Sequence, residues 1–280
     1  MRCDRPRNPS RLTSPARHVS SALALASLLF ASPLQALPAC IPRTEVPHAK
    51  VVRVEKNGVI VLADGRAARL EGLLLPAGAD DHAPQFVADQ AIAAIDSQTT
   101  GQPVTLAAQA PKEDRYGRIR AQILVDGKDR EIWLQRELLR KGLARVAIAP
   151  DRNECAEELY AAEAVARRSG TGLWSSKAYA VRSPSQTDAV SGTFQIVEGT
   201  ITSVSHKGGR IFLAFGGQTD ADFRAIISQD DMKRFREIGV DPFAYANQAV
   251  RVRGFVESNR DRPEIELATP AQVEIVEAAP

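Results

Sequence analysis

Apolar and polar residues alternate with a period of two along residues 51–76, a pattern typical of half-buried strands. The stretch is interrupted by Asn57-Gly58 and by Asp64-Gly65, and both dipeptides favour the positive φ values that tight hairpins need. The pattern therefore predicts a three-stranded meander.

Three later segments repeat their apolar residues at the spacing of one helical face. The predicted helices run from Pro84 to Gly101, from Leu134 to Gly142 and from Asp151 to Gly170. In the third, Asp151 is the expected N-cap of a capping box with Glu154, and Cys155 begins the buried stripe. Two further strands are predicted between the first and second helices, at 104–108 and 119–125.

A serine-rich stretch, residues 176–192, predicts a linker. Beyond it short strands alternate with turns, and one helix is expected at Asp230–Ile238. Five strands with a helix between the third and the fourth is the order of an OB barrel, and the first part of the chain has the same order with extra helices. We therefore expect a mainly β fold with helices (α+β), in which residues 40–175 form one OB barrel and residues 193–280 a second, smaller OB-like barrel.

Residues 1–39 have the features of a secretory signal peptide. Five arginines and one acid precede the short apolar run SSALALASLLFASPLQA, which falls below the roughly 18 to 20 residues of a membrane span. Without this leader the chain has 31 basic and 33 acidic residues, a net charge near −2. We therefore expect an exported protein, periplasmic or secreted, with no transmembrane span in the mature chain. Its charge excludes the broad positive field of a general nucleic-acid binder, so any phosphate binding depends on a focused site.

Two cysteines, Cys40 and Cys155, remain after the leader. In an oxidising compartment we expect them to form a disulfide. The alternative is that Leu37-Pro38-Ala39-Cys40 is a lipoprotein cleavage box, which would attach a lipid to Cys40 and forbid the bridge. Proline at the third position of such a box is unusual, and this favours the disulfide.

The stretch DRYGRIRAQILVDGK, followed by LLRKGLARV and by CAEELYAAEAVARRSGTGLWS, resembles the staphylococcal nuclease (thermonuclease) family over about residues 45–175. The resemblance implies an OB barrel that, in active members, hydrolyses DNA and RNA phosphodiesters with one bound calcium ion. That reaction needs carboxylates that hold a divalent cation and arginines that stabilise negative charge on the phosphate.

The resemblance assigns two arginines to the phosphate. Arg69 matches the arginine at the end of the family's third strand, and Arg118 matches the arginine of its Tyr-Gly-Arg turn. Tyr116 falls where the family has a tyrosine near the ligand. A purely structural interpretation is also open, because the turn needs its glycine and arginine stems cover apolar surface.

The carboxylates of the family's site are missing. Where the family has Asp-Gly-Asp-Thr in the first hairpin, this chain has Glu-Lys-Asn-Gly at 55–58, and where the family has Asp-Thr-Pro-Glu, this chain has Leu-Leu-Pro-Ala at 74–77. The metal ligands and the general base are therefore absent, and we predict no metal and no cofactor, with calcium only if other acids take over. His48, His82 and His206 are scattered singly, which argues against zinc.

Four neighbouring acids could substitute for the missing ones: Glu55, Glu71, Asp80 and Asp81. A period of two would place Glu71 on the same strand face as Arg69. We therefore expect Glu71 to pair with Arg69 and with Arg118, forming an internal salt bridge where the phosphate would lie.

These features favour an exported, catalytically degenerate thermonuclease-like module that binds nucleic acid or an envelope protein. The alternative is an active phosphodiesterase, a DNA or RNA nuclease, that uses displaced carboxylates. The second barrel does not decide between them, because its phenylalanines could be a base-stacking platform or a barrel core and residues 190–280 hold ten basic and thirteen acidic residues. The phenylalanines in question are Phe212, Phe215, Phe223 and Phe255.

Overall fold

A computed structural model describes residues 38–42, 45–127, 131–216, 223–259 and 262–276. Nearly all of the expected signal peptide therefore lies outside the described residues. Within the described part of the chain, no helix is long and apolar enough to cross a membrane.

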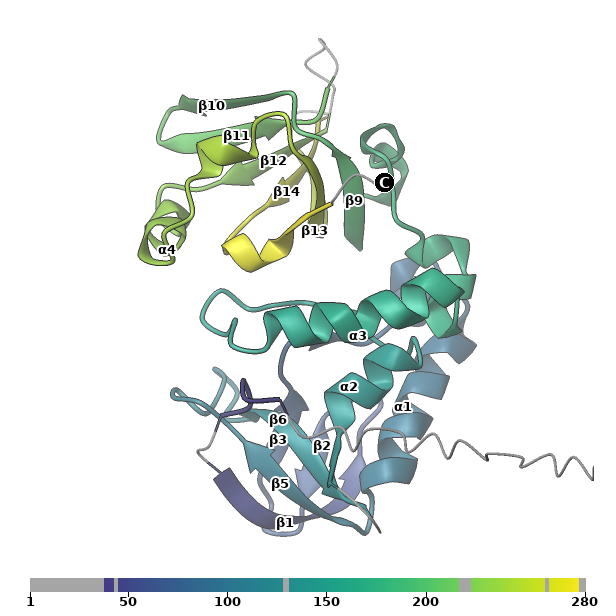
Figure 1. The fold of residues 1–280 in the computed structure, drawn as a ribbon. Helices are drawn as coiled ribbons and strands as arrows, with labels where there is room; N and C mark the ends of the chain where they lie inside the picture. Colours follow the sequence, from purple (N-terminus) through teal and green to yellow (C-terminus); the bar gives the residue numbers. More distant parts are fainter. Residues whose placement is uncertain (1–37, 43–44, 128–130, 217–222, 260–261, 277–280) are drawn as a thin grey trace, which may run out of the picture. The chain divides into compact units, whose positions relative to one another are not determined.

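The first sheet closes into a barrel (Figure 1). Its strands are β1 (Glu45–Val54), β2 (Ile60–Leu62), β3 (Ala67–Leu70), β5 (Pro103–Ala107), β6 (Ile119–Asp126) and β7 (Glu131–Trp133). They are hydrogen-bonded in the order β3-β2-β1-β5-β6-β7, and a parallel pairing of β3 with β6 closes the ring. This is the OB strand order, so the predicted mixed α+β fold with a closed five-stranded barrel is confirmed.

The meander of the first three strands is confirmed with the two expected turns. Asn57-Gly58 lies between β1 and β2, and Asp64-Gly65 lies between β2 and β3, with φ of 80° at Gly58 and 86° at Gly65. These positive φ values are the backbone conformation that glycine favours in tight hairpin turns.

Three α-helices pack on the barrel, and Figure 1 shows α2 between α1 and α3. They are α1 (Gln85–Thr99), α2 (Leu134–Arg140) and α3 (Ala156–Ser169). The first two begin and end close to the predicted positions. Their apolar stripes join the barrel interior in one core, in which Ile95, Leu138 and Trp133 are fully buried.

The third helix begins later than predicted. Its N-cap is Cys155 and no side chain caps it, so the expected capping box of Asp151 and Glu154 is wrong. The carboxylate of Asp151 instead accepts hydrogen bonds from Arg120, at 2.7 and 3.0 Å. An ion pair with a guanidinium therefore replaces the cap.

Two short strands and a 3-10 turn complete this part of the fold. β4 (Leu73–Leu74) pairs with β8 (Arg145–Val146), and the turn η1 (Gly78–Asp81) follows β4. The pairing fixes the path of the chain immediately after β3, which is where the resemblance placed the missing acids.

The expected linker, residues 176–192, contains three 3-10 turns and buried side chains. The turns are η3 (Lys177–Tyr179), η4 (Pro184–Gln186) and η5 (Asp188–Val190), and they follow η2 (Gly172–Ser175). Tyr179 and Val190 are buried, with 3% and 7% of their surface exposed. The serine content signalled turns and did not reveal these two anchors.

The second sheet has seven strands, and one α-helix lies between two of them in the chain. The elements are β9 (Phe194–Thr200), β10 (Ser203–Lys207), β11 (Arg210–Ala214), β12 (Arg224–Ile227), α4 (Asp231–Glu237), η6 (Pro242–Tyr245), β13 (Ala249–Asn259), β14 (Arg262–Glu266), η7 (Pro270–Gln272) and β15 (Val273–Ile275). The strand order is β10-β11-β12-β14-β13-β15, and β13 also pairs with β9. The helix lies between β12 and β13, as the sequence predicted.

The phenylalanines of this sheet do not form one platform. Phe215 and Phe223 are buried and contact each other, with ring centroids 5.1 Å apart, so they belong to the core. Phe212 lies under the guanidinium of Arg224, whereas Phe255 is 55% exposed. The core interpretation therefore holds for two of the four.

A buried ion pair ties β13 to α3. Arg253 and Glu163 both have fully buried side chains, and Arg253 Nη1 lies 3.1 Å from a Glu163 carboxylate oxygen. Glu163 also accepts hydrogen bonds from the backbone N–H of Val146 and from Arg167.

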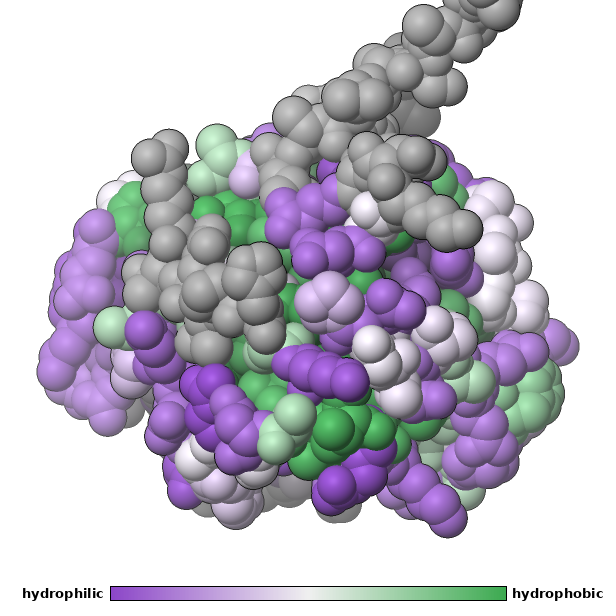
Figure 2. Space-filling view, turned by 90° about the horizontal axis from the view of Figure 1, so that it is seen from below, coloured by the Kyte–Doolittle hydropathy of each residue, from purple (hydrophilic) through white to green (hydrophobic). Residues whose placement is uncertain are grey.

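The described residues form no single large apolar area on the face shown in Figure 2. Apolar residues form separate patches there, between hydrophilic ones.

Candidate functional site

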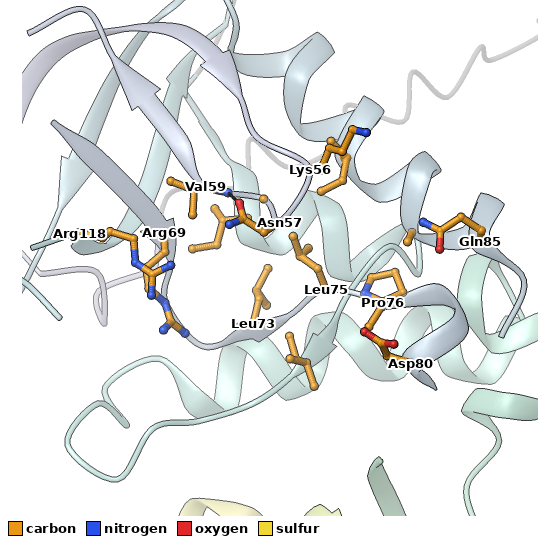
Figure 3. Close-up of a pocket in the computed structure, with 16 residues that line it drawn as sticks. Lys56, Asn57, Val59, Arg69, Leu73, Leu75, Pro76, Asp80, Gln85 and Arg118 are labelled. Carbon is orange, nitrogen blue, oxygen red and sulfur yellow. Dashed lines mark hydrogen bonds between the residues drawn. The ribbon is translucent and has the colours of Figure 1, made fainter. Parts of the chain in front are cut away.

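Two arginines, Arg69 and Arg118, line a cavity of about 460 Å³ in the first barrel (Figure 3). Its walls are the first hairpin, residues 56–59, the segment 73–77 that follows β3, and the first turns of α1. Arg69 and Arg118 complete the lining, and Figure 3 shows their side chains together on one side of it. The volume is that of a small-ligand site.

Arg69 reaches this cavity because burial alternates along β3. Ala68 and Leu70 point into the core, with 0% and 5% of their surface exposed, so Arg69 faces out and is half-buried. Parallel pairing of β3 with β6 sets Arg69 beside Arg120. Arg69 makes no ion pair with any residue that the structure describes, and its guanidinium is therefore available to an anion.

Arg118, in contrast, is paired within its own turn. Asp114 accepts from Arg118 Nε at 2.8 Å, and its second oxygen accepts the backbone N–H of Tyr116 and of Arg118. Burial of the Asp114 carboxyl opposes ionisation, but the hydrogen bonds from Arg118 and from the two amides outweigh it and lower its pKa. The charge of Arg118 is therefore largely neutralised.

Tyr116 stands at the mouth of a neighbouring hollow that Arg69 and Arg118 also line. Its ring is 65% exposed, and the guanidinium carbons of Arg115 and Arg118 lie 4.8 and 4.9 Å from its centroid. The arrangement holds an aromatic ring beside Arg115, which has no ion pair with a described residue, and beside Arg118, which is paired with Asp114.

The predicted pairing of Glu71 with Arg69 and Arg118 is wrong. Glu71 is 4% exposed and accepts from Arg120 Nε at 2.8 Å, and Asp151 binds the same guanidinium. The hydrogen bonds that Arg120 donates to Asp151 and to Glu71 raise the pKa of its guanidinium.

The alternation of β3 does not extend to Glu71. The strand ends at Leu70, the Glu71 amide bonds to the carbonyl of Ala121, and Gly72 turns the chain with a φ of 80°. The side chain of Glu71 therefore faces β6 instead of the cavity.

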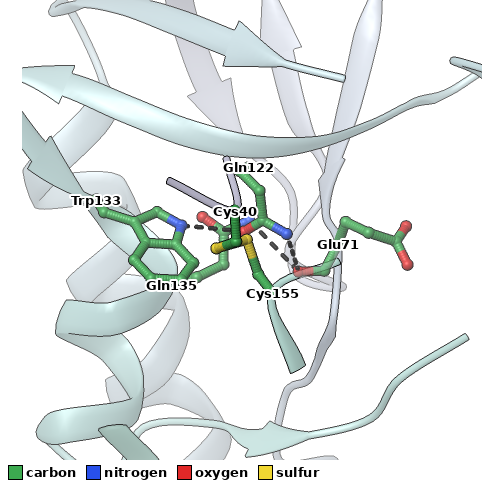
Figure 4. Close-up of a disulfide and its surroundings, with 6 residues drawn as sticks. All are labelled: Cys40, Glu71, Gln122, Trp133, Gln135 and Cys155. Carbon is green, nitrogen blue, oxygen red and sulfur yellow. Dashed lines mark hydrogen bonds between the residues drawn. A yellow bond between two sulfur atoms is a disulfide. The ribbon is translucent and has the colours of Figure 1, made fainter. Parts of the chain in front are cut away.

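Buried polar side chains and the disulfide support the segment around Glu71 (Figure 4). Gln122 accepts from the indole N–H of Trp133 at 3.0 Å, and its amide lies 3.5 Å from the Glu71 carbonyl. Gln135 bonds to the backbone of β6.

The disulfide joins Cys40 to Cys155, with 5.2 Å between their Cα atoms, so the predicted bridge is present. The sulfur of Cys40 is thereby occupied, whereas a lipid anchor would need it free.

Only Asp80 of the four proposed substitute acids lines the cavity. Asp81 is buried and accepts from Arg145 at 3.0 Å, from the Tyr179 hydroxyl at 2.9 Å and from the Ala77 amide at 2.8 Å. Glu55 pairs with Arg53 outside the lining. The carboxylate of Asp80 is exposed and has no partner among the described residues.

The lining does not fit calcium. The ion takes six to eight oxygen ligands, whereas Asp80 is the sole carboxylate of this lining and no three His, Cys, Asp or Glu side chains gather anywhere in the described chain. Asn57 accepts the amide of Val59 with its side-chain oxygen. Leu75 packs so closely on Gly58 that a Cβ at that glycine would lie 2.2 Å from its Cδ1. Apolar packing thus joins the two walls from which the acids are missing.

Three charged residues of the site were not predicted: Asp114, Arg120 and Asp151. The first had a signal in the sequence, since an aspartate at the start of a Gly-containing turn commonly accepts the amides of that turn. The other two meet through a contact between residues 31 positions apart, for which no local pattern exists.

Comparison with known proteins gives one finding. No curated protein matches this chain. Residues 76–176 match the family model described as "Staphylococcal nuclease homologue". The match begins at Pro76, after the strand that carries Arg69, and includes α1, α2, α3 and the turn with Tyr116 and Arg118. This segment, within an OB-like barrel, is therefore similar to the staphylococcal nuclease family.

Proposed function

We propose that the protein is an exported binding module that holds a single nucleic-acid strand in the Arg69 cleft without cutting it. The observation that carries the proposal is the state of the two arginines. Arg69 lacks a carboxylate partner among the described residues, and Arg118 lies beside it with its charge held by Asp114. The similarity of residues 76–176 to the nuclease family supports a phosphodiester as the anion.

In this proposal Arg69 donates hydrogen bonds to one phosphodiester, and the exposed ring of Tyr116 stacks on a neighbouring base. A guanidinium suits this role because its planar donors match phosphate oxygens. Stacking on an aromatic ring is tolerant of sequence and needs an unpaired base, which favours a single strand over a duplex.

Hydrolysis is not part of the proposed function. The cut requires stabilisation of charge on both the attacking and leaving oxygens, and the cavity wall where the resemblance places the acids is formed by Leu74, Leu75 and Pro76. The oxidising compartment that a disulfide requires, together with the predicted leader, supports export.

One observation favours a second candidate, an active phosphodiesterase. Asp80 lines the same cavity as Arg69 with its carboxylate unpaired, so it could act as a displaced general base. A further candidate ligand is an envelope protein, which the binding test below distinguishes from nucleic acid.

The test combines hydrolysis and binding. Purified protein is incubated with single-stranded DNA and RNA, with calcium and then with chelator, and binding is titrated over a salt series. We expect intact substrate in every lane and an affinity that falls with salt, because each neutralised phosphate releases a counterion. The Arg69→Ala variant should bind more weakly, while Arg168→Ala, a change at an exposed arginine on α3, should bind as the wild type.

Calcium-dependent cutting that is lost in Arg69→Ala would establish the phosphodiesterase instead. No binding to either nucleic acid would leave a protein ligand as the remaining candidate.

A further inference from the structure

Three charged residues that line the Arg69 cleft have no ion pair with a described residue: Lys56, Arg69 and Asp80. Figure 3 shows the ammonium of Lys56 at the edge of the cleft, directed away from Leu73 and Leu75. The other two have opposite signs. Arg69 lies on one side and Asp80 on the other, and Figure 3 shows Leu73, Leu75 and Pro76 between them. Neither charged side chain has an ion pair with a described residue. A ligand that satisfies both must be anionic at one end and donate hydrogen bonds at the other.

The space between the two charges is apolar. Val59 and Leu73 are buried, each with 6% of its surface exposed, and Leu75, Ile92 and Pro76 continue the lining. A flat, uncharged group fits such a surface, because it loses little by leaving water and gains apolar contact with these side chains. A nucleotide in a strand has these groups in this order: an anionic phosphodiester, then a flat base, and hydrogen-bond donors on the far edge of the base.

The carboxylate of Asp80 selects among the bases. Ionised, it accepts hydrogen bonds through two oxygens and donates none. Guanine presents two adjacent donors on its Watson–Crick edge, the ring N1–H and the exocyclic amino group. Adenine and cytosine place a ring acceptor beside their amino group, and thymine flanks its single N–H with carbonyls, so each would set an acceptor against the carboxylate.

We propose that the cleft reads guanine: the phosphodiester lies on Arg69, the base lies against Leu73 and Leu75, and its paired N–H donors bind Asp80. This inference rests on the proposed function, since it names the base that accompanies the phosphodiester. It requires no metal and no covalent step.

The experiment compares oligothymidylates that differ only in one central base: guanine, inosine or adenine. Inosine keeps N1–H and lacks the amino group, so it removes one of the two donors. Affinity is measured by fluorescence anisotropy at one salt concentration with the purified protein. We expect guanine to bind about 10- to 150-fold more tightly than inosine, the range of one hydrogen bond to a charged group, and adenine to bind no better than inosine.

Three variants separate the roles. Asp80→Asn replaces one carboxylate oxygen with an N–H donor. The variant should bind the guanine and inosine oligonucleotides with about equal affinity, since its amide cannot accept from both N–H donors of guanine. Arg69→Ala should weaken all three oligonucleotides by a similar factor and keep the preference. Glu157→Gln, which removes one exposed charge from α3, should match the wild type in both respects. Asp80 is exposed and bonds to no described residue through its side chain, so an unchanged thermal unfolding midpoint is expected for Asp80→Asn.

Equal affinity for guanine and inosine would overturn the inference and leave the proposed function standing, and so would a preference that survives in Asp80→Asn. Failure of all three oligonucleotides to bind would overturn the proposed function, and the guanine inference with it.

Discussion

Arg118 is held by Asp114, four residues earlier in the same turn, with 2.8 Å between Nε and a carboxylate oxygen. The residue that the resemblance assigns to the phosphate is therefore neutralised by its own turn. The same carboxylate also accepts two amides of that turn, so it stabilises the loop while it lowers the charge of the cleft. Of the two arginines that the resemblance assigns to the phosphate, Arg69 is consequently the one without an ion pair among the described residues.

Release of Arg118 should strengthen nucleic-acid binding. In Asp114→Asn the side-chain oxygen can still accept the two amides, but the charge is lost, and we expect affinity for single-stranded oligonucleotides to rise about 3- to 10-fold. The slope of log affinity against log salt should steepen by about 0.7, the value for one more neutralised phosphate on a single strand.

The matched control is Asp64→Asn, which breaks an Asp–Arg pair of the same kind in the second hairpin, where Arg66 is the partner. It raises the net charge equally and lies outside the cavity lining. Equal gains in both variants would mean that net charge, and not the release of Arg118, is responsible.

Acid should destabilise the fold through Asp114. Its pKa is lowered in the folded protein, burial notwithstanding, by Arg118 and by the two backbone amides. A carboxyl whose pKa is depressed on folding contributes stability above its unfolded pKa of about 3.9, and that contribution is lost as the pH falls through the folded value. We expect the free energy of unfolding in urea to decrease below about pH 4. Asp114→Asn should be less stable at pH 7 and should approach the wild type at pH 3, and parallel curves would contradict this assignment.

The disulfide should contribute strongly to stability. Cys40 and Cys155 are 115 residues apart, and a cross-link of that span stabilises by about 5 kcal/mol in the chain-entropy model. We expect reduction to lower the free energy of unfolding by an amount of that order. Cys40→Ala and Cys155→Ala should each cause the same loss, and reductant should have no further effect on either. A reduced protein as stable as the oxidised one would show that the bridge adds nothing.

The buried pair of Arg253 and Glu163 should be costly to break from one side. Both side chains are fully buried, so Arg253→Met leaves Glu163 with Arg167 as its one cationic partner among the described residues, and we expect a loss of up to about 3 to 5 kcal/mol. The double variant Arg253→Met/Glu163→Leu removes both charges and should recover part of the loss. Urea unfolding of the two single variants and the double variant gives the coupling energy, and strictly additive losses would exclude a specific interaction.

Much of the fold could be predicted from the sequence because its signals are local. Glycine-containing turns fixed the hairpins, and apolar spacing located α1 and α2. The start of α3 was misplaced because Asp151, a good N-cap by type, has a stronger partner in Arg120. Residue type alone does not reveal such competition from a distant side chain.

The site was predicted in part, for the same reason. That residues 56–58 and 74–77 contain no acid can be read directly, since it is a matter of residue identity. The partner of Glu71 could not be predicted from the sequence, because it depends on where β3 ends and on the pairing of β3 with β6 that closes the barrel. The ion pairs of Arg118 and Arg120 decide which cation is available, and both follow from tertiary geometry.

Arg145 belongs to the matching segment, yet its contacts reach well past the end of that segment at Ser176. From β8 it donates to Asp81, the neighbour of Asp80, and to the carbonyl of Phe194 at the start of β9, while its guanidinium lies over the rings of Tyr179 and Phe194. The side chain of Arg145 is 3% exposed. In a protein that ends at Ser176, its guanidinium would lose the Phe194 carbonyl and the rings of Tyr179 and Phe194. The smallest fragment that retains a correctly placed Asp80 is therefore expected to extend beyond residue 176, where the match to the family model ends, and a fragment cut at that boundary would lose part of what supports the cleft.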